Sequence, residues 1–147
     1  MRVTTTATID RPVEQVFRFQ ADEHYRNHPR WDPAVTKLEP LGAEPIRLGS
    51  RFELTRKMMG REETHTFEVV EWEAPTRFAI ETRSPGFSLR IAANCVSAGD
   101  ARTQLTVSGD AQVGGLRGLL APLMKGKLTR DARANVARIK QMVECET

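Results

Sequence analysis

The sequence predicts an α+β protein in which a curved antiparallel sheet of about seven strands wraps around one long C-terminal helix. Most of the chain between Phe52 and Val113 alternates polar and apolar residues, which is typical of strands. Residues 116–144 instead place apolar side chains at steps of three and four, which is typical of one face of a helix. Such a helix cannot bury its apolar face against itself, so we expect it to lie on the strands. Its apolar face is predicted to contain Leu116, Leu120, Leu123, Met124, Leu128, Ala132, Val136, Ile139, Met142 and Val143.

The composition, with 39% hydrophobic residues, predicts one globular domain covering residues 1–147. No apolar run approaches the roughly 18 residues of a membrane-spanning helix, and the N-terminus lacks the apolar core of a signal peptide. We therefore expect a cytoplasmic protein with no integral membrane segment, either a monomer or a homodimer. Cys95 and Cys145 have no Cys-x-x-Cys spacing and are expected to be reduced thiols.

Two short helices are predicted between the first and second strands. Residues 3–9 alternate within a β-branched run and form the first strand. Asp10 is a candidate N-cap for a helix over about residues 12–21. Residues 22–31 form a second short helix or turn, and residues 35–38 a short strand.

His24 and His28 are four residues apart, a spacing that metal-binding pairs use on helices. Zinc in a tetrahedral site needs at least three protein ligands, and no third ligand has a suitable spacing. We therefore expect no metal site and interpret both residues as surface histidines. No cofactor is indicated either.

The segment 50–72 is predicted to be a β-hairpin with a tight turn at Met59-Gly60. That turn pairs residues whose numbers add to 119, so Phe52 lies opposite Phe67 on the inner face. The register brings opposite charges together across the strands, which supports it. Its further pairs are Arg51–Glu68, Leu54–His65, Arg56–Glu63 and Lys57–Glu62.

Arg56, Glu63 and His65 are the candidate catalytic residues, because this register points all three toward the inner face. Arg56 and Glu63 could form an ionic pair that orients a ligand oxygen, or they could be an ordinary cross-strand pair near the end of the hairpin. His65 could serve as a general acid or base, because the unperturbed pKa of a histidine side chain, near 6.5, suits that role. It could equally be a hydrogen-bonded or hydrated histidine near the end of the sheet.

Three stretches resemble a known superfamily: IDRPVEQVFRFQAD at residues 9–22, RWDPAVTKLE at residues 30–39 and VVEWEAPTRFAIET at residues 69–82. Their order and spacing resemble the helix-grip fold of the START-like (SRPBCC) superfamily, and its polyketide cyclase/dehydrase branch in particular. The resemblance covers essentially the whole chain. It implies a cavity between the sheet and the long helix, and ligands such as lipids, polyketides or sterols.

The leading functional expectation is that the protein binds a small apolar ligand in that cavity. The first alternative is a polyketide cyclase or aromatase that uses the Arg56, Glu63 and His65 region. The second is a partner- or membrane-surface-binding module that uses the basic face of the C-terminal helix. The expected lining residues are Phe52, Leu54, Phe67, Val69, Phe78, Ile80, Phe87, Leu89, Ile91, Leu105, Val107, Leu120, Leu123, Met124 and Leu128.

The first part of the long helix is interpreted as a deformable lid. Pro122 interrupts the helical pattern and should bend the helix, and the nearby glycines lower its stiffness. Met124 is expected at the mouth of the cavity, where its pliable side chain suits ligands of varied shape. The helix carries seven basic and two acidic residues in 116–144, and we expect Arg133 and Arg138 on its solvated face. No aromatic residue lies among those charges, which argues against nucleic-acid binding by base stacking.

Overall fold

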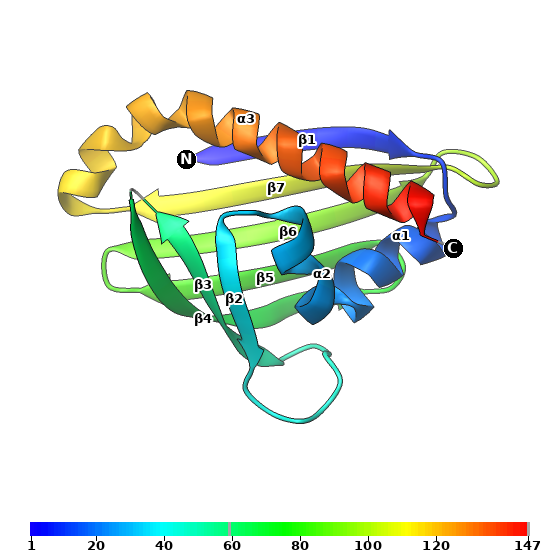
Figure 1. The fold of residues 1–147 in the computed structure, drawn as a ribbon, viewed down its shortest axis with the longest axis horizontal. Coiled ribbons are helices and arrows are strands. Elements are labelled where there is room, and N and C mark those ends of the chain that lie inside the picture. Colours follow the sequence, from blue (N-terminus) through cyan, green and yellow to red (C-terminus); the bar gives the residue numbers. More distant parts are fainter. Residues whose placement is uncertain (59, 147) are drawn as a thin grey trace.

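This computed structural model describes residues 1–58 and 60–146, without the side chains of Arg117 and Ala121. The described chain forms a seven-stranded antiparallel sheet with the strand order β1-β7-β6-β5-β4-β3-β2, and the sheet curves around the helices (Figure 1). The predicted fold class is therefore confirmed. The strands are β1 (Arg2–Ile9), β2 (Val35–Pro40), β3 (Arg51–Met58), β4 (Arg61–Glu73), β5 (Arg77–Ser84), β6 (Phe87–Ser97) and β7 (Thr103–Val113).

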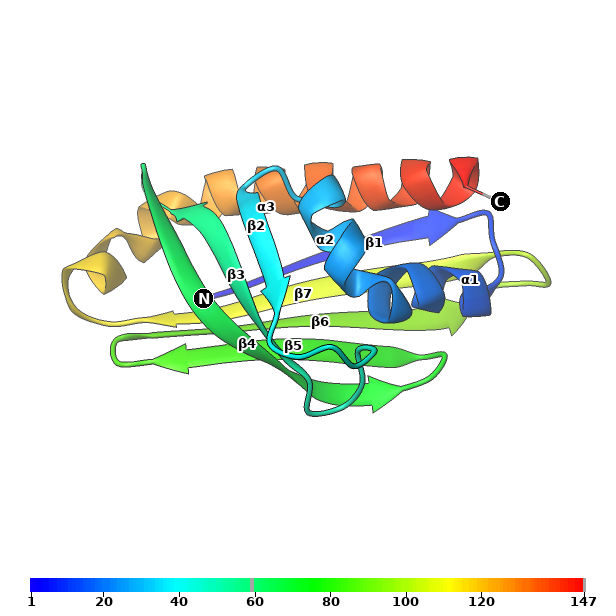
Figure 2. The same cartoon turned by 60° about the horizontal axis from the view of Figure 1, so that its bottom comes forward.

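All the helices lie on one side of the sheet (Figure 2). After β1 the chain forms α1 (Val13–Phe17), a short π-helical turn η1 (Arg18–Asp22) and α2 (His24–Trp31), and it ends in α3 (Gly115–Cys145). The two predicted short helices and the long C-terminal helix are thus confirmed.

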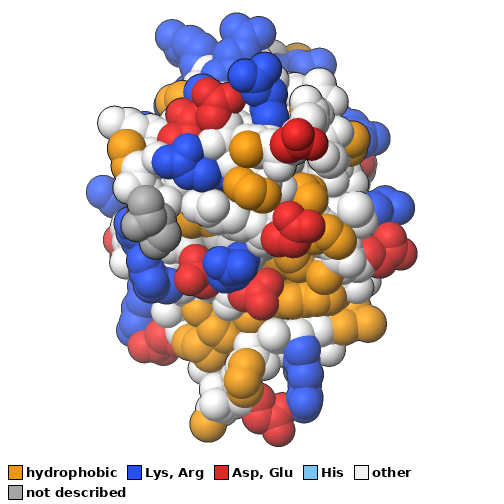
Figure 3. All heavy atoms as spheres, turned by 90° about the vertical axis from the view of Figure 1, so that its right-hand side faces the viewer, with side chains coloured by type: hydrophobic (Ala, Val, Ile, Leu, Met, Phe, Trp, Pro, Cys, Tyr) orange, Lys and Arg blue, Asp and Glu red, His pale blue; other side chains and the backbone are white. Residues whose placement is uncertain are grey.

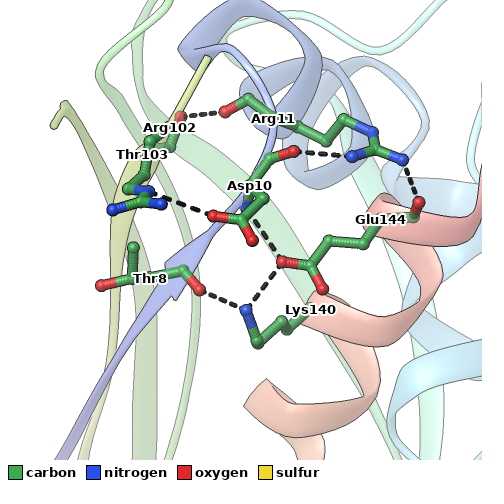
Figure 4. A network of polar contacts seen from close by, with 7 residues as sticks. All are labelled: Thr8, Asp10, Arg11, Arg102, Thr103, Lys140 and Glu144. Carbon is green, nitrogen blue, oxygen red and sulfur yellow. Dashed lines mark hydrogen bonds and ion pairs between the residues drawn. The ribbon is translucent and has the colours of Figure 1, made fainter. Parts of the chain in front are cut away.

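The expected capping role of Asp10 is wrong. The residue before α1 is Pro12, and no side chain caps that helix. Asp10 instead joins the end of β1 to α3, because its backbone N–H donates to Glu144 Oε2 at 2.8 Å while its carboxylate accepts a bond from Arg102. Lys140 and Arg11 complete this network, shown in Figure 4. The last turns of α3 are therefore held against the end of β1.

The β3–β4 hairpin has the predicted register, with residue numbers of opposing pairs adding to 119. Phe52 and Phe67 are opposed and buried, and their rings stack with centroids 5.9 Å apart. Gly60 occupies the turn with φ near +78°, a conformation that glycine adopts without steric cost. Met59, the other predicted turn residue, lies outside the described residues.

The C-terminal half of α3 supplies its part of the core. Val136, Ile139 and Val143 are at most 3% exposed, as their spacing predicts. Arg138 does not lie free on the solvated face, which corrects the expectation. Its Nε donates to the carbonyl of Trp31 at 3.0 Å and so links α3 to the end of α2. Arg138 also donates to Asn135.

The N-terminal part of α3 does not bury the predicted apolar face. Leu116, Leu120 and Leu123 are 82%, 42% and 81% exposed. At 3.6 residues per turn, the distance from Leu116 to Val143 is about seven and a half turns, so the two side chains point in opposite directions. The steps of three and four therefore drift around the helix, and the single apolar face inferred from them was wrong at this end.

The start of α3 bends away from the straight C-terminal half (Figure 1). Pro122 lies inside this part of the helix, as predicted for a bend. Gly118 has a separate reason to be glycine, because a Cβ there would approach the Val113 carbonyl oxygen to 2.5 Å. At this glycine close packing, rather than flexibility, explains the residue type.

Candidate functional site

The inner face of the sheet is covered unevenly by the helices. Directly opposed residues of antiparallel neighbours share a face, so Ile91 points to the same side as Ile80 of β5. Ile80 and Leu105 are fully buried, whereas Ile91, Leu89 and Val107 on this face are only partly buried. The inner face therefore has a closed part and an open part.

The open part lies toward the start of α3. Leu89 and Ile91 follow Phe87 at the beginning of β6, and Phe87 is paired with Val113 at the end of β7, just before α3 begins. A hollow of about 450 Å³ lies at this end of the sheet, around the turn between β5 and β6 and the end of β7; Phe87 lines it, but Leu89, Ile91 and Val107 do not. We call the surface formed by Phe87, Leu89, Ile91, Val107, His65, Glu63 and Arg56 the open half of the inner face.

The residues predicted to line a cavity fall into three groups. The partly buried group contains Leu89, Ile91, Val107, Met124 and Leu128. The expected placement of Leu120 and Leu123 over the inner face is wrong, because both are exposed on the other side of α3. The buried group contains Phe52, Leu54, Phe67, Val69, Phe78, Ile80 and Leu105, which form the packed core that supports the open half, and Phe87, which is buried at the edge of the open half.

The side chains of Met124 and Leu128 point to a different side of α3 from the exposed leucines beside them. Leu128 precedes Ile139 by about three full turns, so the two side chains lie on the same side of α3. Ile139 is fully buried against the core. The side of α3 that carries Leu128 and Met124 therefore faces the sheet.

Three polar side chains stand at the edge of the open half, and they are the three predicted as catalytic candidates. Arg56 lies opposite Glu63 across the hairpin, as predicted. His65 Nε2 is 3.3 Å from Glu63 Oε1, and the His65 ring centroid is 4.9 Å from that of Phe87. The side chains are 15–19% exposed, so solvent or a ligand can reach them.

Arg56 is also held from the helical side. Its Nη1 lies 3.4 Å from Asp32 Oδ2, and the Asp32 side chain is only 6% exposed. Burial opposes ionisation of Asp32, but the contact with His28 and the charge of Arg56 together lower its pKa to about 2. Asp32 is therefore an anion that anchors the guanidinium at the edge of the open half.

The interpretation of His24 and His28 as surface residues was wrong, because both are buried. His24 Nδ1 is 3.1 Å from the Gln20 carbonyl, and His24 Nε2 is 3.1 Å from His28 Nδ1. Burial lowers the pKa of each imidazole, so both are neutral at neutral pH. The two rings thus continue the polar chain from Asp32 into the core.

Sequence reasoning missed this buried chain, although one signal for it was present. His24, His28 and Asp32 follow one another at steps of four, which places them on one side of α2. Within the described residues no group of three or more His, Cys, Asp or Glu side chains could hold a metal ion.

The arrangement can perform two chemical tasks. The apolar side chains of the open half can pack against a hydrocarbon or ring system. Arg56 can donate hydrogen bonds to a ligand oxygen, and His65, oriented by Glu63, can exchange a proton with a ligand. The combination suits a ligand with an apolar body and an oxygen-bearing end.

The curved sheet, the long helix and this partly open apolar face define a helix-grip protein. The chain belongs to the polyketide cyclase/dehydrase and lipid transport family, whose sequence model matches residues 1–144. The predicted superfamily and branch are therefore confirmed. No curated protein matches the sequence significantly.

Solved structures of several helix-grip proteins resemble this one. A protein of Thermus thermophilus is 18% identical, with 97% of each chain covered and a TM-score of 0.77. The Zhui aromatase/cyclase of a Streptomyces species is 18% identical over 98% of this chain and 93% of its own, with a TM-score of 0.76. Norcoclaurine synthase of Thalictrum flavum is 11% identical over 100% of this chain and 95% of its own, with a TM-score of 0.74. At these identities the likeness establishes the fold alone.

Among the described residues, no helix combines the length and the apolar character needed to cross a membrane.

Proposed function

We propose that the protein binds a small, largely apolar ligand between the open half of the inner face and the first half of α3. The observation that supports this most directly is the incomplete burial of Leu89, Ile91 and Val107 on the face that the helices otherwise cover. Leaving apolar area accessible costs about 25 cal/mol per Å² relative to burying it. A ligand that fills the space recovers this free energy.

The polar edge of the site indicates what kind of ligand fits. Arg56 keeps donors available beyond its contact with Asp32 Oδ2, because a guanidinium carries five N–H groups. The ligand is therefore expected to carry a carbonyl, hydroxyl or carboxylate oxygen at the end that lies near Arg56. The family's description as lipid transport proteins and cyclases fits such amphipathic molecules.

A pair of neighbouring substitutions in α3 tests the site. Met124 is partly buried, and its neighbour Leu123 is 81% exposed on the other side of the helix. We expect Met124→Trp to narrow the space and raise the Kd of a fluorescent fatty acid roughly tenfold, which corresponds to about 1.4 kcal/mol. Leu123→Trp adds the same ring to the same turn and should leave the Kd unchanged.

Native mass spectrometry of freshly purified protein should show co-purified small molecules. The affinity for the fluorescent probe should change little with ionic strength, since burial of apolar surface is insensitive to screening. The proposal fails if several apolar probes show no saturable binding to the wild-type protein at any salt concentration.

A second candidate function is cyclisation or aromatisation of a poly-β-keto substrate. The 3.3 Å contact between His65 and Glu63 favours it, because a carboxylate that orients an imidazole is a common arrangement for proton transfer. Turnover of such a substrate should be lost in His65→Ala and retained in Thr66→Ala, whose side chain is exposed and points to the other face of β4. Equal turnover by wild type and His65→Ala would exclude this role for His65.

A further inference from the structure

The first turns of α3 expose a row of leucines. Leu116, Leu119, Leu120 and Leu123, which we call the leucine patch, are 82%, 75%, 42% and 81% exposed. Their spacing of three and four places them on one side of the helix, opposite the side that faces the sheet. Contiguous exposed aliphatic side chains of this kind generally mark an interaction surface.

Basic residues continue the same side of α3. Lys127 and Arg130 follow Leu123 by four and seven residues, so they lie in line with the leucine patch. Lys125, two residues after Leu123, is exposed as well but points to a different side of the helix. The sequence contains no acidic residue between Gly115 and Arg130. The first half of α3 is therefore aliphatic and cationic together.

The position of this segment makes it accessible. The bent start of α3 projects at the left of Figure 1, at the end of the sheet where β7 finishes. The opposite end of the molecule, where α3 finishes, has side chains of both charges mixed over its surface (Figure 3). There, Arg11 and Lys140 both donate to Glu144, and Lys140 also donates to the Thr8 carbonyl of β1. Among the described residues, the exposed leucines of α3 thus lie at the end of the molecule away from this network.

We propose that the leucine patch docks this end of the protein onto the surface of an anionic lipid bilayer. A helix that carries leucines and lysines or arginines on its outer side inserts the apolar side chains at the boundary of head groups and acyl chains. The cations then lie beside the lipid phosphates, each adding electrostatic attraction at the membrane surface. The outward side of α3 presents both features together.

A second copy of the chain is a less suitable partner for the leucine patch than an anionic bilayer. In a two-fold symmetric dimer each surface contacts its own equivalent, so two segments that both carry net positive charge would face each other. Asp131 is the first acidic residue of α3, and it already pairs with Lys127 at 2.9 Å. An anionic surface removes this repulsion, whereas self-association would increase it.

Vesicle co-flotation tests the leucine patch. Wild-type protein should float with phosphatidylglycerol-containing vesicles, and much less with pure phosphatidylcholine vesicles. The variant Leu119→Gln/Leu123→Gln should lose this binding by roughly tenfold or more. A matched control, Leu41→Gln/Leu48→Gln, removes two leucines that are 52% and 60% exposed in the loop after β2 and should bind as wild type.

The cations are tested in the same assay. Lys127→Gln/Arg130→Gln should weaken binding and flatten its dependence on salt, because fewer charges approach the phosphates. The control Arg2→Gln/Lys57→Gln makes the same change in net charge at exposed positions outside α3. Circular dichroism confirms that each variant is folded.

Three outcomes would overturn the proposal. The first is no flotation of the wild type with anionic vesicles at low salt. The second is flotation that the leucine variant and its control share equally. The third is a dimer in analytical ultracentrifugation that the leucine substitutions dissociate, without any vesicle binding, since this would make a second copy the occupant. Binding of the fluorescent fatty acid is measured separately, in the absence of vesicles. A negative flotation result would therefore overturn membrane docking without deciding whether the proposed ligand site exists.

Discussion

His28 and Asp32 face each other at the end of α2, with Nε2 of the imidazole 3.6 Å from Oδ2 of the carboxylate and both side chains almost entirely buried. His24 Nδ1 donates to the Gln20 carbonyl, so a neutral His24 accepts at Nε2 from His28 Nδ1. His28 and Arg56 both stabilise the Asp32 carboxylate, and the guanidinium of Arg56 supplies a full positive charge beside it.

The buried histidines predict a loss of stability in mild acid. Burial lowers the pKa of His24 and of His28 below the ordinary value of 6.5. Below that pH the unfolded chain therefore binds protons that the folded protein does not. The free energy of unfolding should fall as the pH drops below about 6.5, by up to about 1.4 kcal/mol per pH unit for each histidine. Asp32, with its pKa lowered from 3.8 to about 2, adds a further loss as the pH falls through that interval.

Urea unfolding at a series of pH values measures this effect. The slope of the free energy of unfolding against pH gives the number of protons that the unfolded chain binds in excess of the folded protein. His24→Phe keeps an aromatic ring beside Phe52 and Phe78 but should reduce the slope between about pH 6 and 5 by about one proton. Tyr25→Phe, at the next position of α2, removes no group that titrates in this range and should keep the wild-type slope. An unchanged slope in His24→Phe would show that His24 is protonated in the folded protein.

The two sides of α3 should differ sharply in their contribution to stability. Ile139→Ala empties a site that is fully buried and should cost about 2–5 kcal/mol. Leu123→Ala removes the same amount of hydrocarbon from a side chain that is 81% exposed and should cost less than about 0.5 kcal/mol. Equal losses in urea melts would mean that the helix is rotated from the orientation described above.

Arg138 should matter more than its neighbour Arg133 on the same helix. Arg138→Gln removes a charged donor from the Trp31 carbonyl at the end of α2, at a cost of about 1.5 kcal/mol. Arg133 is exposed, and Arg133→Gln should cost under about 0.5 kcal/mol. Denaturant midpoints of the two variants compare them directly. Identical midpoints would indicate that the bond to Trp31 adds nothing to stability.

The two thiols should react at very different rates. Cys145 is exposed, whereas Cys95 is 1% exposed and burial raises its pKa to about 12. Because the thiolate is the reactive form, iodoacetamide should alkylate Cys145 alone in the folded protein and both residues in urea. Mass spectrometry of the intact protein counts the adducts. Cys145→Ser should then give none under native conditions, and a rapid adduct on that variant would contradict the burial of Cys95.

The hairpin shows what the sequence can predict. The side-chain period of a strand is two, so one turn position determines every pair across β3 and β4. That register places Phe52 and Phe67 on the core side of the hairpin, and the structure has the same pairs. The orientations of Arg56, Glu63 and His65 followed from the same step.

The orientation of α3 and the environment of the histidines could not be obtained in this way. Steps of three and four keep neighbouring residues close, but over the length of α3 they allow the apolar row to rotate, so Leu116 and Val143 end on opposite sides. The burial of His24 depends on groups from other parts of the chain, including Phe52 of β3 and Phe78 of β5, whose rings lie against it. A local pattern in α2 contains no information about those groups.

The pairing of β1 with β7 affects the order in which the strands can pair during synthesis and folding. Thr6 lies opposite Thr106, about a hundred residues later in the chain, and the amino group of Met1 bonds to the Ala111 carbonyl. At about 5–20 residues per second, a ribosome needs roughly 5–20 s to make the partner of β1. The first strand synthesised is thus the last to acquire its neighbour. Four of its eight residues are threonines and one is an arginine, so most of its side chains are polar while it is unpaired. Contacts this distant also slow refolding of the complete chain, because the loop must close before they form.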